Sequence, residues 1–155
     1  MSTTDRATES ARAVQTRGID PRGARFAAGL TTVLLAVALA ASPSTLTVTL
    51  LAVQAGVFAV GAASGVQRTP YSWVFRRVVR PRLAPPAELE DPAPPRFAQA
   101  VGLGFTVVAL LGYLTGADLL GAVATGFALA AALLNAAFGL CLGCEVYLLA
   151  RRVTS

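Results

Sequence analysis

Four long apolar stretches alternate with polar segments along this chain. They cover about residues 24–41, 45–63, 97–115 and 119–139, and the last continues as an apolar segment to about residue 150. A helix needs roughly 17–25 residues to cross the hydrocarbon core of a bilayer, so each stretch is long enough, the first only barely. The pattern predicts an all-α fold: an integral membrane four-helix bundle within residues 24–150.

The polar segments predict two regions outside the bilayer. Residues 1–23 cannot bury a core, so we expect a flexible tail. Residues 64–96 form a loop rich in Arg and Pro, whose first part, residues 71–80, mixes aromatic residues with Arg. That composition is typical of an amphipathic helix in the membrane interface, whereas the Pro-rich part should be extended and exposed.

The last apolar stretch is too long for a single span. From Leu119 to Leu149 it would measure roughly 45 Å as one helix, against a hydrocarbon core of ~30 Å. The helix therefore either projects beyond the membrane or breaks near Gly139 and continues along the interface.

The basic residues all lie on one side of this pattern. All thirteen are Arg, and they fall near the N-terminus, in the long loop or at the C-terminus, whereas the two short turns hold none. By the positive-inside rule, both termini and the long loop are cytoplasmic. The same placement explains the net charge of +5 without a nucleic-acid partner.

A motif repeats at the start of the first and third stretches. Asp20-Pro21-x-x-x-Arg25-Phe26-Ala27 recurs as Asp91-Pro92-x-x-x-Arg96-Phe97-Ala98. The first stretch, with Ala38-Leu39-Ala40 near its end, also fits a signal peptide, but a signal peptide does not explain the second copy. A membrane-entry motif explains both, and predicts two hairpin repeats related by a pseudo-twofold axis along the membrane normal.

The residues most suited to a chemical role are the Cys141-x-x-Cys144 pair at the end of the fourth stretch. These are the only cysteines, and the chain has no His, which excludes a Ser-His-Asp triad. A new helix that began at Cys141 would stabilise a thiolate, whereas an unbroken helix would disfavour it. Inert packing cysteines remain an alternative. A metal site is a weaker one, because with Glu145 the pair offers three ligands and zinc prefers four; we expect no metal.

Two amides and an Arg cluster are further candidates. Gln54 and Asn135 should face the bundle interior at similar depth, with the second and fourth spans in contact. They either hydrogen-bond helices together or line a ligand pocket. Arg76, Arg77 and Arg80 either meet anionic lipid headgroups or bind an anionic substrate, such as a sulfur oxyanion, near the thiols.

Glycines are spaced for close packing near the ends of the second and fourth stretches. The two motifs are Gly61-x-x-x-Gly65 and Gly139-x-x-x-Gly143. Such small-x-x-x-small spacing lets helix backbones approach closely, so we interpret both motifs as packing sites.

The motifs together resemble a known family. Asp20-Pro21-Arg22-Gly23-x-Arg25-Phe26, Pro94-Pro95-Arg96-Phe97-Ala98-Gln99 and above all Asn135-Ala136-Ala137-Phe138-Gly139-x-Cys141-x-Gly143-Cys144-Glu145 look like the bacterial integral membrane family DUF 4395. That family has no established activity, so the resemblance implies the fold and a thiol pair after the fourth span. The architecture also looks like DoxX-type membrane proteins of sulfur and thiol metabolism, and vitamin K epoxide reductase uses a Cys-x-x-Cys in a similar bundle.

These observations predict a multi-pass protein of the bacterial inner membrane. Its leading function is a thiol-redox or sulfur relay through Cys141 and Cys144, with a thioredoxin- or rhodanese-type cytosolic partner. A non-enzymatic scaffold subunit and a small oligomeric transporter are the alternatives. No nucleotide-binding loop is present, and the sequence indicates no particular cofactor.

Overall fold

Four long helices form the body of the molecule in the computed structural model, which describes residues 2–9 and 18–155. They are α2 (Pro21–Ala40), α3 (Thr45–Ser64), α5 (Ala93–Leu114) and α6 (Asp118–Phe138). Each is long and apolar enough to cross a membrane. The predicted all-α fold is confirmed, and by length and composition the chain is a multi-pass membrane protein.

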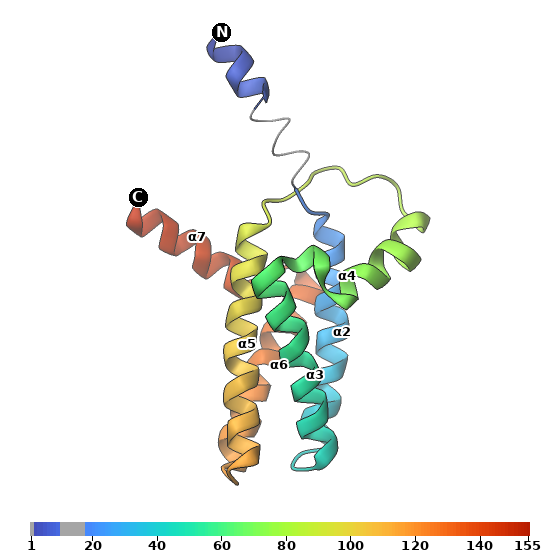
Figure 1. Ribbon diagram of the computed structural model, residues 1–155, viewed down its shortest axis with the longest axis vertical. Coiled ribbons are helices and arrows are strands. Elements are labelled where there is room, and N and C mark those ends of the chain that lie inside the picture. Colours follow the sequence, from blue (N-terminus) through green and yellow to red (C-terminus); the bar gives the residue numbers. More distant parts are fainter. Residues whose placement is uncertain (1, 10–17) are drawn as a thin grey trace.

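The helices run alternately up and down around a ring. Neighbours in the ring are α2 and α3, α3 and α5, α5 and α6, and α6 and α2. The short turns that close each hairpin lie at one end of the bundle, and both termini and the long α3–α5 connection lie at the other (Figure 1). Within the described residues, α3 and α6 are not a packed pair, so the predicted contact between the second and fourth spans is wrong. They lie diagonally across the bundle.

The apolar core occupies the half of the bundle nearer the short turns. It consists of small and medium side chains from all four helices: Leu35, Ala38, Leu51, Ala109, Ala124 and Ala128. Small residues let helix backbones approach closely, and van der Waals contact between them stabilises helices in lipid. Because Leu35 and Ala38 are fully buried here, α2 is an integral part of the bundle.

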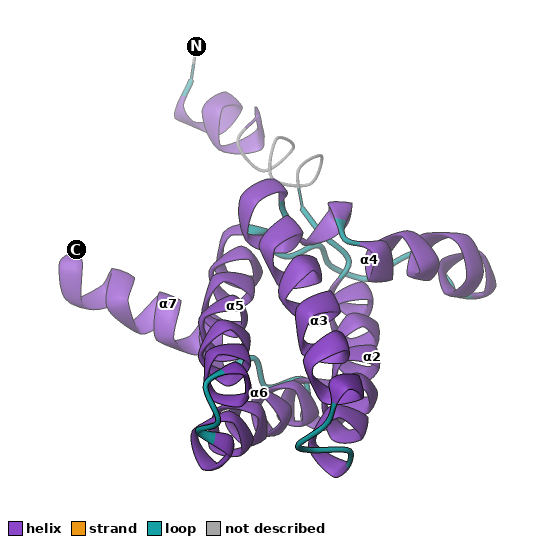
Figure 2. Cartoon of the chain, turned by 60° about the horizontal axis from the view of Figure 1, so that its bottom comes forward, coloured by secondary structure: helices purple, strands orange, loops and turns teal. Residues whose placement is uncertain are grey.

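The long connection between the hairpins is largely helical. It contains η1 (Val66–Arg68), α4 (Pro70–Val74), η2 (Phe75–Val79) and η3 (Arg80–Arg82), in agreement with the helix expected around residues 71–80. Figure 1 shows this connection leaving the bundle on one side, and the last helix, α7 (Leu142–Thr154), leaving it on the other. Figure 2 shows the same arrangement from a tilted view.

Two expectations about the polar segments need correction. Pro94 and Pro95 are buried in the first turn of α5, where a helix tolerates proline, so only the preceding residues are extended. The flexible tail was expected to reach residue 23, but α2 begins at Pro21, capped by Asp20. Residues 3–9 form a short helix, and the rest of the predicted tail, residues 10–17, lies outside the described residues.

The two hairpins repeat the same contacts at their entry. Asp20 accepts a hydrogen bond from the backbone N–H of Arg22, and Asp91 accepts one from the N–H of Ala93. The residues just before them, Ile19 and Glu90, exchange two backbone hydrogen bonds of 2.9 Å across the interface between the halves. Equivalent residues pairing with each other is what a twofold axis produces, so this bridge marks where the pseudo-twofold axis passes.

An aromatic pair recurs in each half as well. Phe26 packs on Phe75 at 5.8 Å between ring centroids, and Phe97 packs on Tyr147 at 5.6 Å, with nearly equal interplanar angles. Phe75 lies in η2 and Tyr147 in α7. The segment that begins with α4 and the helix α7 are therefore equivalent parts of the two repeats.

Candidate functional site

The helix break that sequence reasoning left open is present. Gly139 has a φ of 69° and ends α6 in the left-handed region, which glycine adopts without a Cβ penalty. Leu140 is not helical, and Cys141 is the N-cap of α7, which begins at Leu142. The fourth apolar stretch is thus a span followed by a separate helix, and that helix has its own N-terminus at the first cysteine.

The two cysteines are joined at this N-terminus. Cys141 and Cys144 form a disulfide with their Cα atoms 5.2 Å apart, and the Cys141 sulfur accepts a hydrogen bond of 3.3 Å from the N–H of Cys144. Both residues are half-buried. Glu145 follows in the first turn of α7. Within the described residues, no three His, Cys, Asp or Glu side chains gather into a group that could hold a metal ion.

The first half of the chain builds the same cap with hydroxyl groups. Thr69 is the N-cap of α4, and its side chain accepts a hydrogen bond of 3.3 Å from the N–H of Ser72. The hydroxyls of Thr69 and Ser72 are 3.1 Å apart and hydrogen-bonded to each other. Thr69 precedes Phe75 by the same number of residues as Cys141 precedes Tyr147. Oxygen therefore fills in one repeat the capping role that sulfur fills in the other.

Arg25 holds the helix end that comes just before the cysteines. Its guanidinium donates to the carbonyls of Ala136 and Ala137 at 3.3 and 3.4 Å, in the last turn of α6. It also lies against Gly139. The C-terminal end of α6 carries partial negative charge that would disfavour a nearby thiolate, and a guanidinium bonded to its carbonyls offsets that charge.

Arg96 makes the equivalent contact in the other half. It donates to the carbonyls of Ala62 and Ala63 at 2.7 and 2.8 Å, just before Gly65, whose φ is 99°. Sequence reasoning missed this role for both Arg residues, although the repeated motif contained them. Each Arg caps the span that packs beside its own helix rather than a span of its own hairpin.

The glycines of the two predicted packing motifs divide into packing and turning positions. A Cβ on Gly61 would lie 2.5 Å from the side chain of Gln99, and a Cβ on Gly143 would lie 2.7 Å from the Cα of Ala98. Both therefore allow a close approach to α5. Gly65 and Gly139 instead have positive φ and end their helices. The α7 N-terminus is held against α5 because position 143 carries no side chain.

Gln54 and Asn135 do not share a site. Gln54 is fully buried, donating to the Thr31 hydroxyl at 3.3 Å and accepting from the Tyr71 hydroxyl at 2.8 Å. Asn135 is half-buried and lies three residues before the end of α6, whereas Gln54 lies ten before the end of α3. At 1.5 Å per residue their depths differ by about 10 Å, so the expectation of similar depth is wrong.

The Gln54 cluster ties the long connection to the bundle. Burial raises the pKa of Tyr71, which keeps its phenol protonated and able to donate. Through Tyr71 the start of the interfacial segment is fixed to the middle of α3. A buried amide with hydrogen bonds at both its nitrogen and its oxygen fits interhelical bonding, the first of the two roles considered for it.

The Arg cluster lies away from the cysteines. Arg77 lies over the Trp73 ring at 5.4 Å, and Arg76 donates to the carbonyl of Gln67. These residues and Arg80 belong to the connection on one side of the bundle, whereas α7 leaves on the opposite side (Figures 1 and 2). The expectation that the cluster binds an anion near the thiols is therefore wrong.

The residues that make the contacts described so far lie in the part of the chain from Ile19 to α7. A protein-family model matches the chain over the same region, residues 19–152, and its description is Domain of unknown function (DUF4395). The chain belongs to this family. The matched residues include both repeats and the cysteine pair, and the match confirms the predicted family. No curated protein and no solved structure matches the chain.

Proposed function

We propose that this DUF4395 protein is a thiol-redox or sulfur-relay component of the bacterial inner membrane. The Cys141–Cys144 pair would exchange electrons or carry sulfur with a cytosolic partner of thioredoxin or rhodanese type. The observation that carries the proposal is the position of Cys141 as the N-cap of a fresh helix, bonded to Cys144. Helix N-termini stabilise thiolates, and a thiolate is the form of cysteine that reacts.

The comparison between the two repeats supports the same role. Thr69 and Ser72 build an equivalent cap without sulfur, so the fold does not require cysteine at these positions. A stable cap explains the hydroxyls. It does not explain a pair of thiols, whose distinctive property is reversible oxidation.

The exchange would proceed through a mixed disulfide. The thiolate of reduced Cys141 attacks a disulfide of the oxidised partner and forms a sulfur–sulfur bond with it. The Cys144 thiolate then attacks the Cys141 sulfur and releases the partner as a dithiol. Two electrons and two protons pass from the pair to the partner, and the reverse reaction reoxidises the partner.

Thiol reactivity at graded pH tests the proposal. In the reduced full-length protein, Cys141 should reach half-maximal alkylation at least about one pH unit below the ~8.5 of a free thiol. Mass spectrometry of the alkylated peptide distinguishes Cys141 from Cys144. The Arg25→Gln variant should move the midpoint upward, because the negative end of α6 is then uncompensated. Arg96→Gln is the matched control and should leave it unchanged.

One outcome would contradict the proposal, and another would exclude only the contribution of Arg25. If both thiols titrate above about pH 9, neither is activated relative to the ~8.5 of a free cysteine, and the scaffold alternative gains support. If the midpoint is low but insensitive to Arg25→Gln, the redox role stands and Arg25 is excluded from it. A transporter has less support, because Gln54 and Asn135 do not line a common path.

The proposed location has a prediction of its own. The Arg residues within the described part of the chain flank the end of the bundle that carries the long connection and the last helix, which favours the cytoplasm on that side. A reporter fused after Ser155 should be active only in the cytoplasm, and one inserted between Thr115 and Asp118 should read as external. Reporter activity on the opposite side at either position would contradict the proposed four-span topology.

A further inference from the structure

A cavity of about 340 Å³ lies where the start of the first repeat meets the interfacial segment. Its walls come from parts of the chain far apart in sequence: the entry to α2, η1, the α4–η2 segment and the loop before α5. Its apolar lining includes Ile19, Phe75 and Leu89, and its polar lining includes Gln67, Arg76 and Arg80. The cavity therefore combines an apolar wall with two cationic side chains.

The charged side chains around the cavity differ in whether they have a hydrogen-bond or ion-pair partner. Asp20 also lines it, but Arg22 engages that carboxylate with an ion pair of 2.8 Å. The hydrogen bond from Arg22, with a smaller contribution from the nearby positive charge of Arg80, holds the pKa of Asp20 below its usual value, so the carboxylate is charged. Arg76 donates to the carbonyl of Gln67 and keeps its positive charge. Within the described part of the chain, the Arg80 guanidinium has no hydrogen-bond or ion-pair partner.

The cavity lies at the level of the membrane interface. Trp73, the only tryptophan of the chain, is 54% exposed on the neighbouring turn, with Arg77 over its ring. Val78 and Leu83 are also exposed on this segment. Tryptophan and Arg side by side on an amphipathic segment are typical of the headgroup region. A ligand of the cavity would therefore be drawn from that region.

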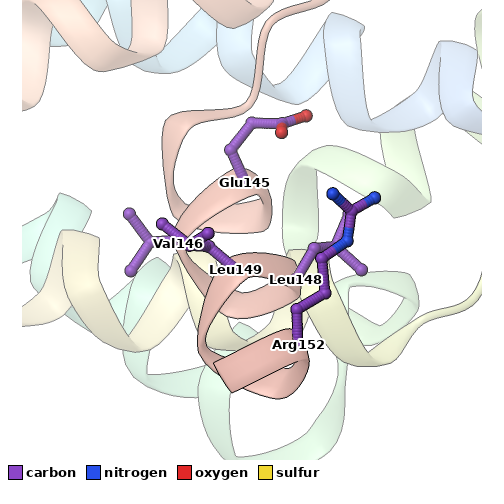
Figure 3. A pocket seen from close by; sticks show the side chains of 5 residues that line it. All are labelled: Glu145, Val146, Leu148, Leu149 and Arg152. Atoms are coloured by element: carbon purple, nitrogen blue, oxygen red, sulfur yellow. The ribbon is translucent and has the colours of Figure 1, made fainter. Parts of the chain in front are cut away.

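The corresponding segment of the second repeat differs in its chemistry. A smaller pocket of about 240 Å³ lies on α7 alone, with Glu145 and Arg152 among apolar side chains (Figure 3). In the register set by Phe75 and Tyr147, Arg80 corresponds to Arg152 and Arg76 corresponds to Leu148. Only the first repeat places two Arg around a cavity. The two repeats therefore differ: the second carries the cysteine pair, and the first carries two Arg side chains around a cavity.

We propose that this cavity binds the phosphate of an anionic phospholipid headgroup, with Arg80 and Arg76 as its ligands and the wall of Ile19, Phe75 and Leu89 beside the glycerol and upper acyl chain. Guanidinium groups match phosphate oxygens in charge and geometry. The proposal does not depend on the cysteines. A bound lipid would connect the start of α2 to the interfacial segment. That segment is already anchored on the bundle by the hydrogen bond from Tyr71 to Gln54.

Lipid titration of the full chain in neutral detergent tests this inference. Short-chain phosphatidylglycerol should bind and change the fluorescence of Trp73, and native mass spectrometry should find it retained, whereas phosphatidylcholine should do neither. Arg80→Gln should weaken binding about tenfold or more, because a hydrogen bond to a charged group is lost. Arg82→Gln is the matched control. Its guanidinium donates to the carbonyl of Val78 outside the cavity, so affinity should stay within about twofold of wild type.

The other outcomes decide between sources of the anion. Equal losses in Arg80→Gln and Arg82→Gln would show a general surface-charge effect and overturn the site. Equal binding of phosphatidylcholine would overturn the requirement for an anion. If inorganic phosphate alone displaces the lipid at low concentration, the phosphate chemistry stands but the assignment to a lipid fails. Unchanged thermal unfolding in Arg80→Gln would confirm that the loss of affinity is not a loss of fold.

Discussion

Replacing Cys141 by Thr and Cys144 by Ser should abolish thiol exchange and leave the bundle intact. The substitution copies the cap of the first repeat, in which Thr69 and Ser72 hold the start of α4. A Thr or Ser N-cap is worth about 1 kcal/mol to a helix, so the variant should unfold no earlier than the reduced wild type. Exchange with a thioredoxin-type partner should fall to background, because no sulfur remains in the chain apart from its single Met.

Single variants sharpen this test. Cys144→Ser should trap a mixed disulfide between Cys141 and its partner, because the resolving thiol is gone, and non-reducing electrophoresis would detect it. Cys141→Thr should trap none. A double variant that keeps every phenotype of the wild type would leave the scaffold alternative as the survivor. Growth under thiol-oxidising stress and exchange kinetics with purified protein are the two measurements.

Gly112→Ala should destabilise the bundle strongly, although it adds a single methyl group. A Cβ at this position of α5 would lie 2.6 Å from the backbone N of Gly121 in α6 and 2.9 Å from its Cα. Backbone atoms cannot rotate away, so the two helices would have to separate. Overpacking of this kind costs about 1–3 kcal/mol, and the separation should lower the unfolding temperature in detergent.

Gly104→Ala is the matched control on the same helix. A Cβ there meets no heavy atom within 4 Å. Since Ala is a better helix former than Gly, the control should be neutral or slightly stabilising. If the two variants unfold at the same temperature, close packing of α5 on α6 at Gly112 is not a source of stability.

The spans and the repeat could be predicted from the sequence because both are local patterns. Hydropathy depends on consecutive residues, and a lipid environment forces such residues into helices, since no water is present to satisfy the backbone. The repeated motif around Arg25 and Arg96 identified the two halves before any contact was known. The pairing of Cys141 with Thr69 needs the register of the aromatic contacts, because alignment of the two turning glycines, Gly65 and Gly139, would instead pair Cys141 with Gln67.

Four helices, their approximate lengths and the residues that precede each hairpin follow from the sequence alone. Which helices touch follows only from the packed bundle: α3 packs on α5 and α6 on α2, so Gln54 and Asn135 are separated and each motif Arg caps the span beside it. The physical reason is that all four spans are similarly apolar and rich in small residues, so hydropathy does not distinguish one neighbour from another. Side-chain fit across the bundle does, at places such as Gly112 against Gly121 and Gly143 against Ala98. The same packing sets where α6 ends and α7 begins, and so makes Cys141 a helix cap.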